Sequence, residues 1–349
     1  MKWTGCHDGY MGYARKSLIC LDDTPYYHVV ARCVRRAWLW GYDDYAGKDY
    51  SHRKAWILHR LRNLADIFSI DLCAYAIMSN HYHLVLRVDR QRMLGWSHAD
   101  IVARWTRLFS APALIQRWED GRASAGEKII AERLIERWRL RLSDISWYMR
   151  CLNEYLARRA NAEDECTGRF WEGRFKSQAL LDETGLLTAM AYVDLNPVRA
   201  GVASTPEESE FTSIFARVQQ WRRESPAQPQ IPARGKSRKR CAARPPLLGF
   251  ADSTGSHPSQ LPMKFPDYLQ LLDWSGRHRL LGKHCVQQDL PPILVRLRIA
   301  PDAWLRMMQP SGNVFGRAIG RLERLQSHAR RLGQSWIRGL QAARMLQSM

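Results

Sequence analysis

The cysteines of this chain form no paired motif, and its hydrophobic runs are short. Eight cysteines are scattered over 349 residues, and no two have the C-x-x-C spacing of a zinc ribbon or a redox motif. No apolar run is long enough to cross a bilayer, and the polar N-terminus lacks the apolar segment of a signal peptide. We therefore expect a cytoplasmic protein with no membrane partner.

Acidic residues are also in deficit. The chain has 34 Asp and Glu against 53 Lys and Arg, which gives a net charge of +19. This excess suits a phosphate backbone or an anionic membrane surface, and equally a basic protein kept soluble by its charge. The 14 Trp and 13 Tyr favour nucleic acid, because aromatic faces stack on unpaired bases. No P-loop motif is present, so ATP-driven chemistry is not indicated.

Hydrophobic patterning predicts an α+β domain in residues 1–205. Strands are expected at residues 26–34, 71–78, 81–88 and 174–181, with a tight turn at Ser79-Asn80. Helices are expected at residues 52–68, around 98–118 and around 128–160. A last helix should begin at the N-cap Asp182 and end before Pro197. This order suits one antiparallel sheet with helices packed on one side.

The rest of the chain has a different character. Residues 206–262, rich in Pro, Ser, Gly and Arg from residue 225 onward, are predicted to form a basic linker. Residues 263–349 are predicted to form a mainly helical, basic C-terminal region. Within the first domain, residues 111–140 have the pattern of an inserted helical pair.

Two short motifs carry groups suited to metal and phosphate chemistry. On a strand, His81 and His83 share a face and can offer two imidazoles to a divalent ion. Two ordinary histidines near a strand end explain such a pair more often. Tyr192 and Asn196 share a helix face, where a phenol can attack phosphorus beside an amide oxygen that completes the metal coordination. The structural alternative is a core tyrosine followed by a helix-ending Asn-Pro.

With two further segments, these motifs resemble the single-tyrosine HUH transposases, in particular the REP-associated tyrosine transposases. The matching segments, which span about residues 24–205 in the family's order, are YYH at 26–28, MSNHYHLVL at 78–86, GRFWEGRFKS at 168–177 and YVDLNPVRAG at 192–201. The resemblance implies a ferredoxin-like sheet with His81 and His83 on a central strand. It also implies that Tyr192, on a helix lying across that sheet, is the nucleophile and that Asn196 is the third metal ligand.

The resemblance also implies a reaction and a substrate. Tyr192 would cut and rejoin single-stranded, hairpin-containing DNA through a 5′-phosphotyrosine intermediate and a free 3′-hydroxyl. A divalent ion, Mg²⁺ or Mn²⁺, would polarise the phosphate from a site made by His81, His83 and Asn196. The implied targets are palindromic repeats, and the protein would act near the nucleoid as a monomer or homodimer.

Cations interleaved with aromatic residues predict contacts to DNA beside this site. The candidates are Arg35, Arg36, Arg169, Trp171, Arg174, Lys176 and Arg199. A loop that is fixed to the core by its aromatic residues, with its cations in water, explains the same pattern. Two other functions remain open: a domesticated, non-catalytic DNA-binding protein that recognises structured repeats, and a metal-dependent phosphoesterase that activates water.

Overall fold

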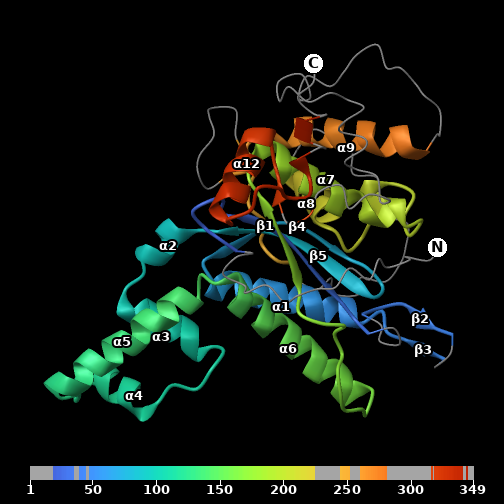
Figure 1. Cartoon of the computed structure of the whole chain (residues 1–349). Coiled ribbons are helices and arrows are strands. Elements are labelled where there is room, and N and C mark those ends of the chain that lie inside the picture. Colours follow the sequence, from blue (N-terminus) through green and yellow to red (C-terminus); the bar gives the residue numbers. More distant parts are fainter. Residues whose placement is uncertain are drawn as a thin grey trace.

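A five-stranded sheet lies at the centre of the molecule, with its strands in the order β4-β5-β1-β6-β7 (Figure 1). The computed structural model describes residues 19–34, 39–44, 47–224, 244–251, 260–280, 316, 318–340 and 343–344. The strands are β1 (Tyr26–Arg32), β4 (Ile70–Ile77), β5 (His81–Val88), β6 (Lys176–Leu180) and β7 (Ala318–Ile319). Their pairing is antiparallel except at β7, which joins β6 in parallel.

The first four of these strands follow the βαββαβ order of a ferredoxin-like sheet. Helices α1 (Arg53–Ile67) and α6 (Ile145–Glu163) cover one face of this sheet, and α7 (Glu183–Arg199) covers the other (Figure 1). Neighbouring residues of β5 therefore meet different helices: Tyr82 donates a hydrogen bond to Asn153 of α6, whereas His83 lies against Asn196 of α7. The predicted α+β class is confirmed. The expectation of helices on one side only is wrong, because the chain returns across the second face after β6.

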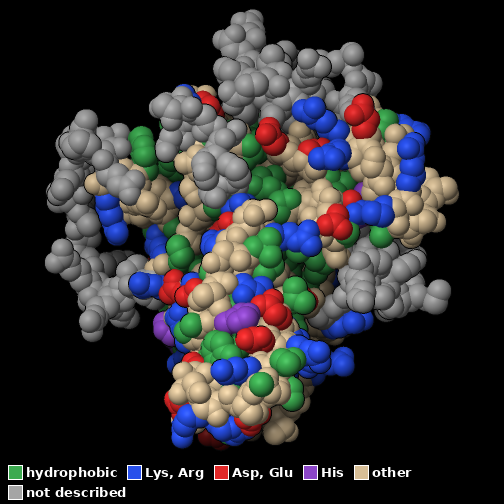
Figure 2. All heavy atoms as spheres, turned by 90° about the vertical axis from the view of Figure 1, so that its left-hand side faces the viewer, with side chains coloured by type: hydrophobic (Ala, Val, Ile, Leu, Met, Phe, Trp, Pro, Cys, Tyr) green, Lys and Arg blue, Asp and Glu red, His purple; other side chains and the backbone are tan. Residues whose placement is uncertain are grey.

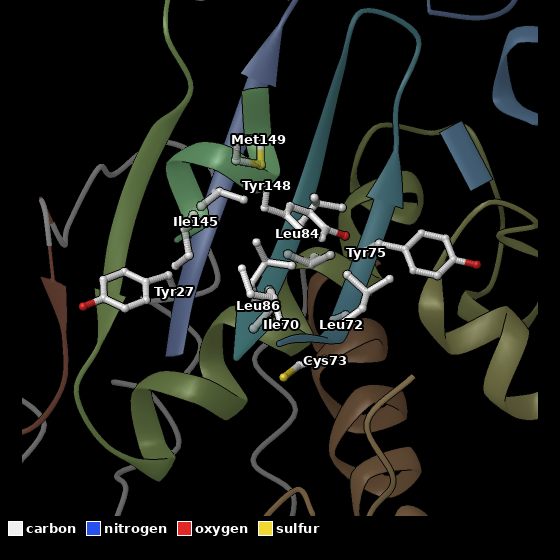
Figure 3. Close-up of a cluster of buried hydrophobic side chains, with 14 of the residues drawn as sticks. Tyr27, Ile70, Leu72, Cys73, Tyr75, Leu84, Leu86, Ile145, Tyr148 and Met149 are labelled. Atoms are coloured by element: carbon white, nitrogen blue, oxygen red, sulfur yellow. The ribbon is translucent and has the colours of Figure 1, made fainter. Parts of the chain in front are cut away.

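A buried apolar layer fills the space between the sheet and α6. Figure 3 shows Tyr148 and Met149 of α6 close to Leu84 of β5, and none of these side chains is more than 1% exposed. Each such side chain contributes about 1.5–3 kcal/mol when it leaves water. Strand β4 is buried on both faces, which explains why its sequence is almost continuously apolar rather than alternating.

The helices between β5 and α6 extend from the sheet as an arm (Figure 1). They are α2 (Arg90–Leu94), α3 (His98–Thr106), α4 (Ala113–Glu119) and α5 (Ala125–Arg141). Both α3 and α5 begin with a capping box, formed by Ser97 with Asp100 and by Ser124 with Glu127. The helical pair predicted at residues 111–140 corresponds to α4 and α5. Helix α5 packs mainly against α3.

Segments from the second half of the chain pack on the face that α7 covers. Helix α8 (Ser213–Glu224) lies inside the predicted linker, where Arg217 donates to the carbonyls of Cys73 in β4 and Leu248. Helix α9 (Phe265–Leu280) contacts α7. Helix α12 (Leu322–Arg331) follows β7. Residues 225–243 of the predicted linker and the predicted helical stretch 302–308 lie outside the described residues.

Two smaller elements complete the described fold. A two-residue hairpin, β2 (Tyr42–Asp43) and β3 (Lys48–Asp49), precedes α1, and a single 3-10 turn, η2 (Pro206–Glu208), precedes α8. No helix in the described part of the chain is both long enough and apolar enough to cross a membrane.

Candidate active site

Helix α7 carries the first half of the site. The Asp182 carboxylate accepts a hydrogen bond from the Gly185 amide at 2.8 Å, which confirms the predicted N-cap. The expectation that Pro197 ends this helix is wrong, because α7 continues to Arg199. Pro197 cannot donate a backbone hydrogen bond, but the helical pattern continues past it, where the Ala200 amide donates to the Asn196 carbonyl at 3.0 Å.

Strand pairing supplies the second half. His83 of β5 is paired with Val30 of β1, and His81 is paired with Arg32. His28 lies two residues before Val30, so its side chain is on the same face as those of His81 and His83. The centroids of the His83 ring and the His81 ring are 5.0 Å apart, and those of the His83 and His28 rings are 5.2 Å apart.

The two halves meet at His83. The Asn196 amide nitrogen lies 3.3 Å from His83 Nε2, and the centroid of the half-buried Tyr192 ring is 5.7 Å from that of His83. The Arg199 guanidinium lies over the Tyr192 ring, 5.4 Å from its centroid. Tyr192, Asn196 and Arg199 follow one another at helical spacing, which gives one face of α7 a phenol, an amide and a cation.

The imidazoles at this site are neutral at pH 7. Burial lowers the pKa of His28 and of His81 to about 4, and the nearby charge of Arg32 adds to the effect at His81. Burial also lowers the pKa of His83 well below its usual value, with a smaller contribution from the neighbouring imidazoles. A neutral imidazole is the form that binds a metal, so the electrostatics of the site suit metal ligation.

The side chains present fit a divalent ion with two imidazole ligands and one amide ligand. In the described residues, no group of three or more His, Cys, Asp or Glu side chains is placed to hold a metal. His81 Nδ1 lies 2.7 Å from Asn80 Oδ1, so its proton is on Nδ1 and Nε2 keeps a lone pair. Asn196 faces His83 Nε2 with its amide, and the oxygen of the same amide can take that place when the group rotates.

The candidate DNA contacts are distributed unevenly. Arg169, Arg174 and Lys176 are exposed on and beside the loop that leads into β6, whereas Arg35 and Arg36 lie outside the described residues. Trp171 is only 9% exposed; its ring packs edge-on against Tyr82, and its indole N–H donates to the Asn153 carbonyl at 2.9 Å. This burial, on the face opposite Tyr192, favours the explanation that Trp171 fixes the loop to the core.

An open pocket of about 490 Å³ lies between this loop and α6. Trp147 and Arg150 of α6 line it together with Arg174 and Phe175 of the loop. Cations beside aromatic rings are the groups that bind single-stranded nucleic acid, so this surface suits a strand running past the loop.

Two residues of the site have no role in the prediction from sequence. His28 Nε2 lies 3.0 Å from His83 Nδ1, and Gln178 Oε1 lies 3.5 Å from His28 Nδ1. His28 falls within a matching segment but carries no assigned chemistry there. Gln178 is found only through the pairing of β6 with β1, which sets it opposite His28 and has no local sequence signal.

Comparisons with known proteins give a distant likeness. No protein-family model matches the chain, and no curated protein matches its sequence. One similar solved structure is that of a REP-associated tyrosine transposase bound to a REP hairpin. It is 11% identical, with a TM-score of 0.35, and the match covers 56% of this chain and 81% of that chain. A match this loose carries no residue roles across, so the chemistry below rests on this chain's own side chains.

Proposed function

We propose that the chain is a transposase-like enzyme that cuts and rejoins single-stranded, hairpin-containing DNA. Tyr192 is its nucleophile, and His81, His83 and Asn196 hold Mg²⁺ or Mn²⁺. The convergence of α7 and β5 carries the proposal: a phenol, an amide and two neutral imidazoles from distant parts of the sequence meet at one position. A structural tyrosine alone does not require any of the other three groups.

The reaction is a phosphodiester exchange. The Tyr192 oxygen bonds to the phosphorus and the bond to the 3′ oxygen breaks, while the phenol gives up a proton and the departing oxygen takes one up. The products are a 5′-phosphotyrosine and a 3′-hydroxyl. Attack by the 3′-hydroxyl of another strand reverses the step, so no nucleotide cofactor is needed. When bound, the divalent ion supplies positive charge that polarises the phosphate.

Arg199 supports the same step from its place on α7. The guanidinium lies 5.4 Å from the centroid of the Tyr192 ring, so it places a positive charge beside the nucleophile, where a phosphate would react. Arg199 is therefore the DNA contact nearest to the nucleophile in this proposal.

Covalent capture of DNA tests the nucleophile. Labelled single-stranded oligonucleotides that form hairpins, taken from DNA flanking the gene, are incubated with protein and Mg²⁺ or Mn²⁺ and run on a denaturing gel. We expect a retarded, protease-sensitive band that is lost in Tyr192→Phe and kept in Tyr42→Phe, a matched change at a tyrosine that is 59% exposed. Hairpin binding without this band would favour a non-catalytic DNA-binding protein, and free 5′-phosphate ends would favour water as the nucleophile.

Removal of a histidine tests the metal site. We expect His83→Ala to slow cleavage by about tenfold or more, because the charge that stabilises the transition state is lost with the ion. His98→Ala is the matched control, since His98 lies on the arm and pairs with Glu136. Cleavage by His83→Ala at the wild-type rate would contradict the assignment of His83 as a metal ligand.

A further inference from the structure

A line of polar contacts crosses three adjacent strands and ends at His83. Gln178 of β6 is paired directly with His28 of β1. His28 lies two residues along β1 from Val30, which is paired with His83 of β5. The three polar side chains therefore project from the same face, toward α7. At the outer end of the line, the Gly316 carbonyl accepts a hydrogen bond from Gln178 Nε2 at 2.7 Å.

The direction of each hydrogen bond follows from this first one. A carbonyl only accepts, so the amide nitrogen of Gln178 faces Gly316 and the amide oxygen faces His28 Nδ1, 3.5 Å away. That oxygen also only accepts, so His28 carries its proton on Nδ1 and, being neutral, has a lone pair on Nε2. His28 Nε2 lies 3.0 Å from His83 Nδ1, which is therefore the donor. His83 keeps its own lone pair on Nε2, the atom that faces Asn196.

We propose that Gln178 and His28 are positioning residues that fix the tautomer and ring orientation of His83, so that Nε2 presents its lone pair to the metal position. The inference rests on the proposed function for the presence of a metal there, but the tautomer exists without one. His81 obtains the same proton placement from Asn80. Partners of this kind make a histidine a better ligand, because the ring does not have to be reoriented when the metal binds.

The proposal gives the C-terminal segment a role at the site. Gly316 lies just before β7, and its carbonyl is the group that sets the orientation of the Gln178 amide. A segment more than a hundred residues after α7 in sequence thus acts on a ligand in β5. It acts through the hydrogen bond between Gln178 and the Gly316 carbonyl.

The tautomers can be measured directly in metal-free protein. Long-range ¹⁵N–¹H spectra of ¹⁵N-labelled protein distinguish Nδ1-protonated from Nε2-protonated histidines, and His28 and His83 are assigned by their loss in variants. We expect both to carry the proton on Nδ1. In Gln178→Met, which lacks both the donor and the acceptor, we expect the His83 ring to lose this preference. The affinity for Mn²⁺, measured by titration, should weaken by about tenfold or more.

Two further variants separate positioning from folding. Gln178→Glu keeps an acceptor for His28, so it should retain the Nδ1-protonated form of His83 and Mn²⁺ affinity near that of the wild type. Ser177→Ala changes the neighbouring residue on the other face of β6 and should leave both measurements unchanged.

Each outcome bears on one proposal. A metal-free wild type with the His83 proton on Nε2 would overturn the inference, even if no variant folds. So would Gln178→Met with the wild-type tautomer and Mn²⁺ affinity. A tautomer that depends on Gln178 in a protein that binds no Mn²⁺ would support the positioning role and count against the proposed function instead.

Discussion

At the scale of single residues, the candidate site depends on imidazoles that remain uncharged because they are buried. His28 is 8% exposed and His83 is 5% exposed, so a proton on either ring would lose most of its hydration. In an unfolded chain the same rings titrate near pH 6.5. The two states of the chain therefore bind different numbers of protons in mildly acidic solution.

We expect the free energy of unfolding to decrease as the pH falls from about 6.5 toward about 4. In that window the unfolded chain takes up a proton at His28, whereas the folded chain does not until its pKa of about 4 is reached. For His28 alone this difference amounts to up to about 3 kcal/mol. Denaturant titrations of wild type and His28→Gln across this range test the effect. The variant should show a weaker pH dependence, and equal dependence would contradict the burial of a neutral His28.

The residues of the site were predictable from sequence where local spacing brings them together. The spacing of His81 with His83 on a strand, and of Tyr192 with Asn196 on a helix, is enough to place each pair on one face. Gln178, the hydrogen-bond partner of His28, was not predictable in this way. It lies opposite His28 because of the register between β1 and β6, which no short motif records.

At the scale of elements, α8 and α9 fix the position of α7 through Asp194, while another face of α7 presents Tyr192. Asp194, which is fully buried, accepts hydrogen bonds from Ser213 and the Ile214 amide of α8 and from the Tyr268 hydroxyl of α9. Burial raises the pKa of Asp194, while the hydrogen bonds lower it. Helices from the second half of the chain thereby fix the position of the helix that carries the nucleophile.

We expect Tyr268→Phe to lower the free energy of unfolding by about 1–3 kcal/mol, because Asp194 then loses a donor in a site without water contact. Chemical denaturation measures the change. Tyr42→Phe is the control. Because Tyr42 is exposed, the free energy of unfolding of this variant should remain within about 0.5 kcal/mol of wild type. If Tyr268→Phe left the free energy of unfolding unchanged, the hydrogen bond between Tyr268 and Asp194 would not be what holds α9 against α7.

The first turn of α7 touches β7 closely enough to require glycine. A Cβ atom at Gly185 would lie 2.7 Å from the Ile319 carbonyl oxygen, which accepts a hydrogen bond from the Leu181 amide. We expect Gly185→Ala to destabilise the protein by roughly 1–3 kcal/mol and to speed hydrogen exchange at the Leu181 amide.

Gly126 provides the matched control in α5, since its Cβ would meet no atom within 4 Å. Gly126→Ala should raise stability by about 0.5–1 kcal/mol, because alanine restricts the unfolded chain more than glycine does. Slow exchange at Leu181 in Gly185→Ala would mean that β7 tolerates the extra methyl group.

Long, strongly patterned elements were predicted well, and short or displaced ones were not. Strands β4 and β5 and helix α1 lie within about two residues of their expected bounds, because Ser79-Asn80 separates the two apolar strands and α1 has apolar residues at helical spacing. Strand β7 has two residues and no pattern of its own, so it forms only because β6 offers an edge. Helix α8 follows a polar stretch, which obscures the apolar face that it packs on β4.

At the scale of the whole molecule, the chain has a net charge of +19. Figure 2 shows Lys and Arg side chains on one face interspersed with Asp and Glu, without a single basic field. Binding of DNA by such a surface depends on a limited number of phosphate contacts at particular places. The exposed cations near β6 are the candidates for those places.

The salt dependence of DNA binding measures the number of phosphate contacts. We expect the logarithm of the single-strand binding constant to fall linearly with the logarithm of salt concentration, with a slope of roughly −0.7 for each phosphate contact. Arg169→Gln, Arg174→Gln and Lys176→Gln should each make the slope shallower by about that amount in anisotropy titrations. Arg122→Gln, in the exposed loop between α4 and α5, should not. An unchanged slope in the first three variants would remove this loop from the DNA path.

The parallel pairing of β7 with β6 has a consequence for synthesis of the chain. Ribosomes deliver residues in order, and Ile319 emerges roughly 140 residues after its partner Leu180. At ordinary elongation rates this leaves β6 with an uncovered edge for about ten seconds or more, which is an opportunity for pairing with another nascent chain. The amide of Gln178 also lacks the Gly316 carbonyl until then. A chain released before residue 316 would contain Tyr192 and its neighbours His28, His83 and Arg199, and would still lack the hydrogen bond that orients the Gln178 amide toward His28.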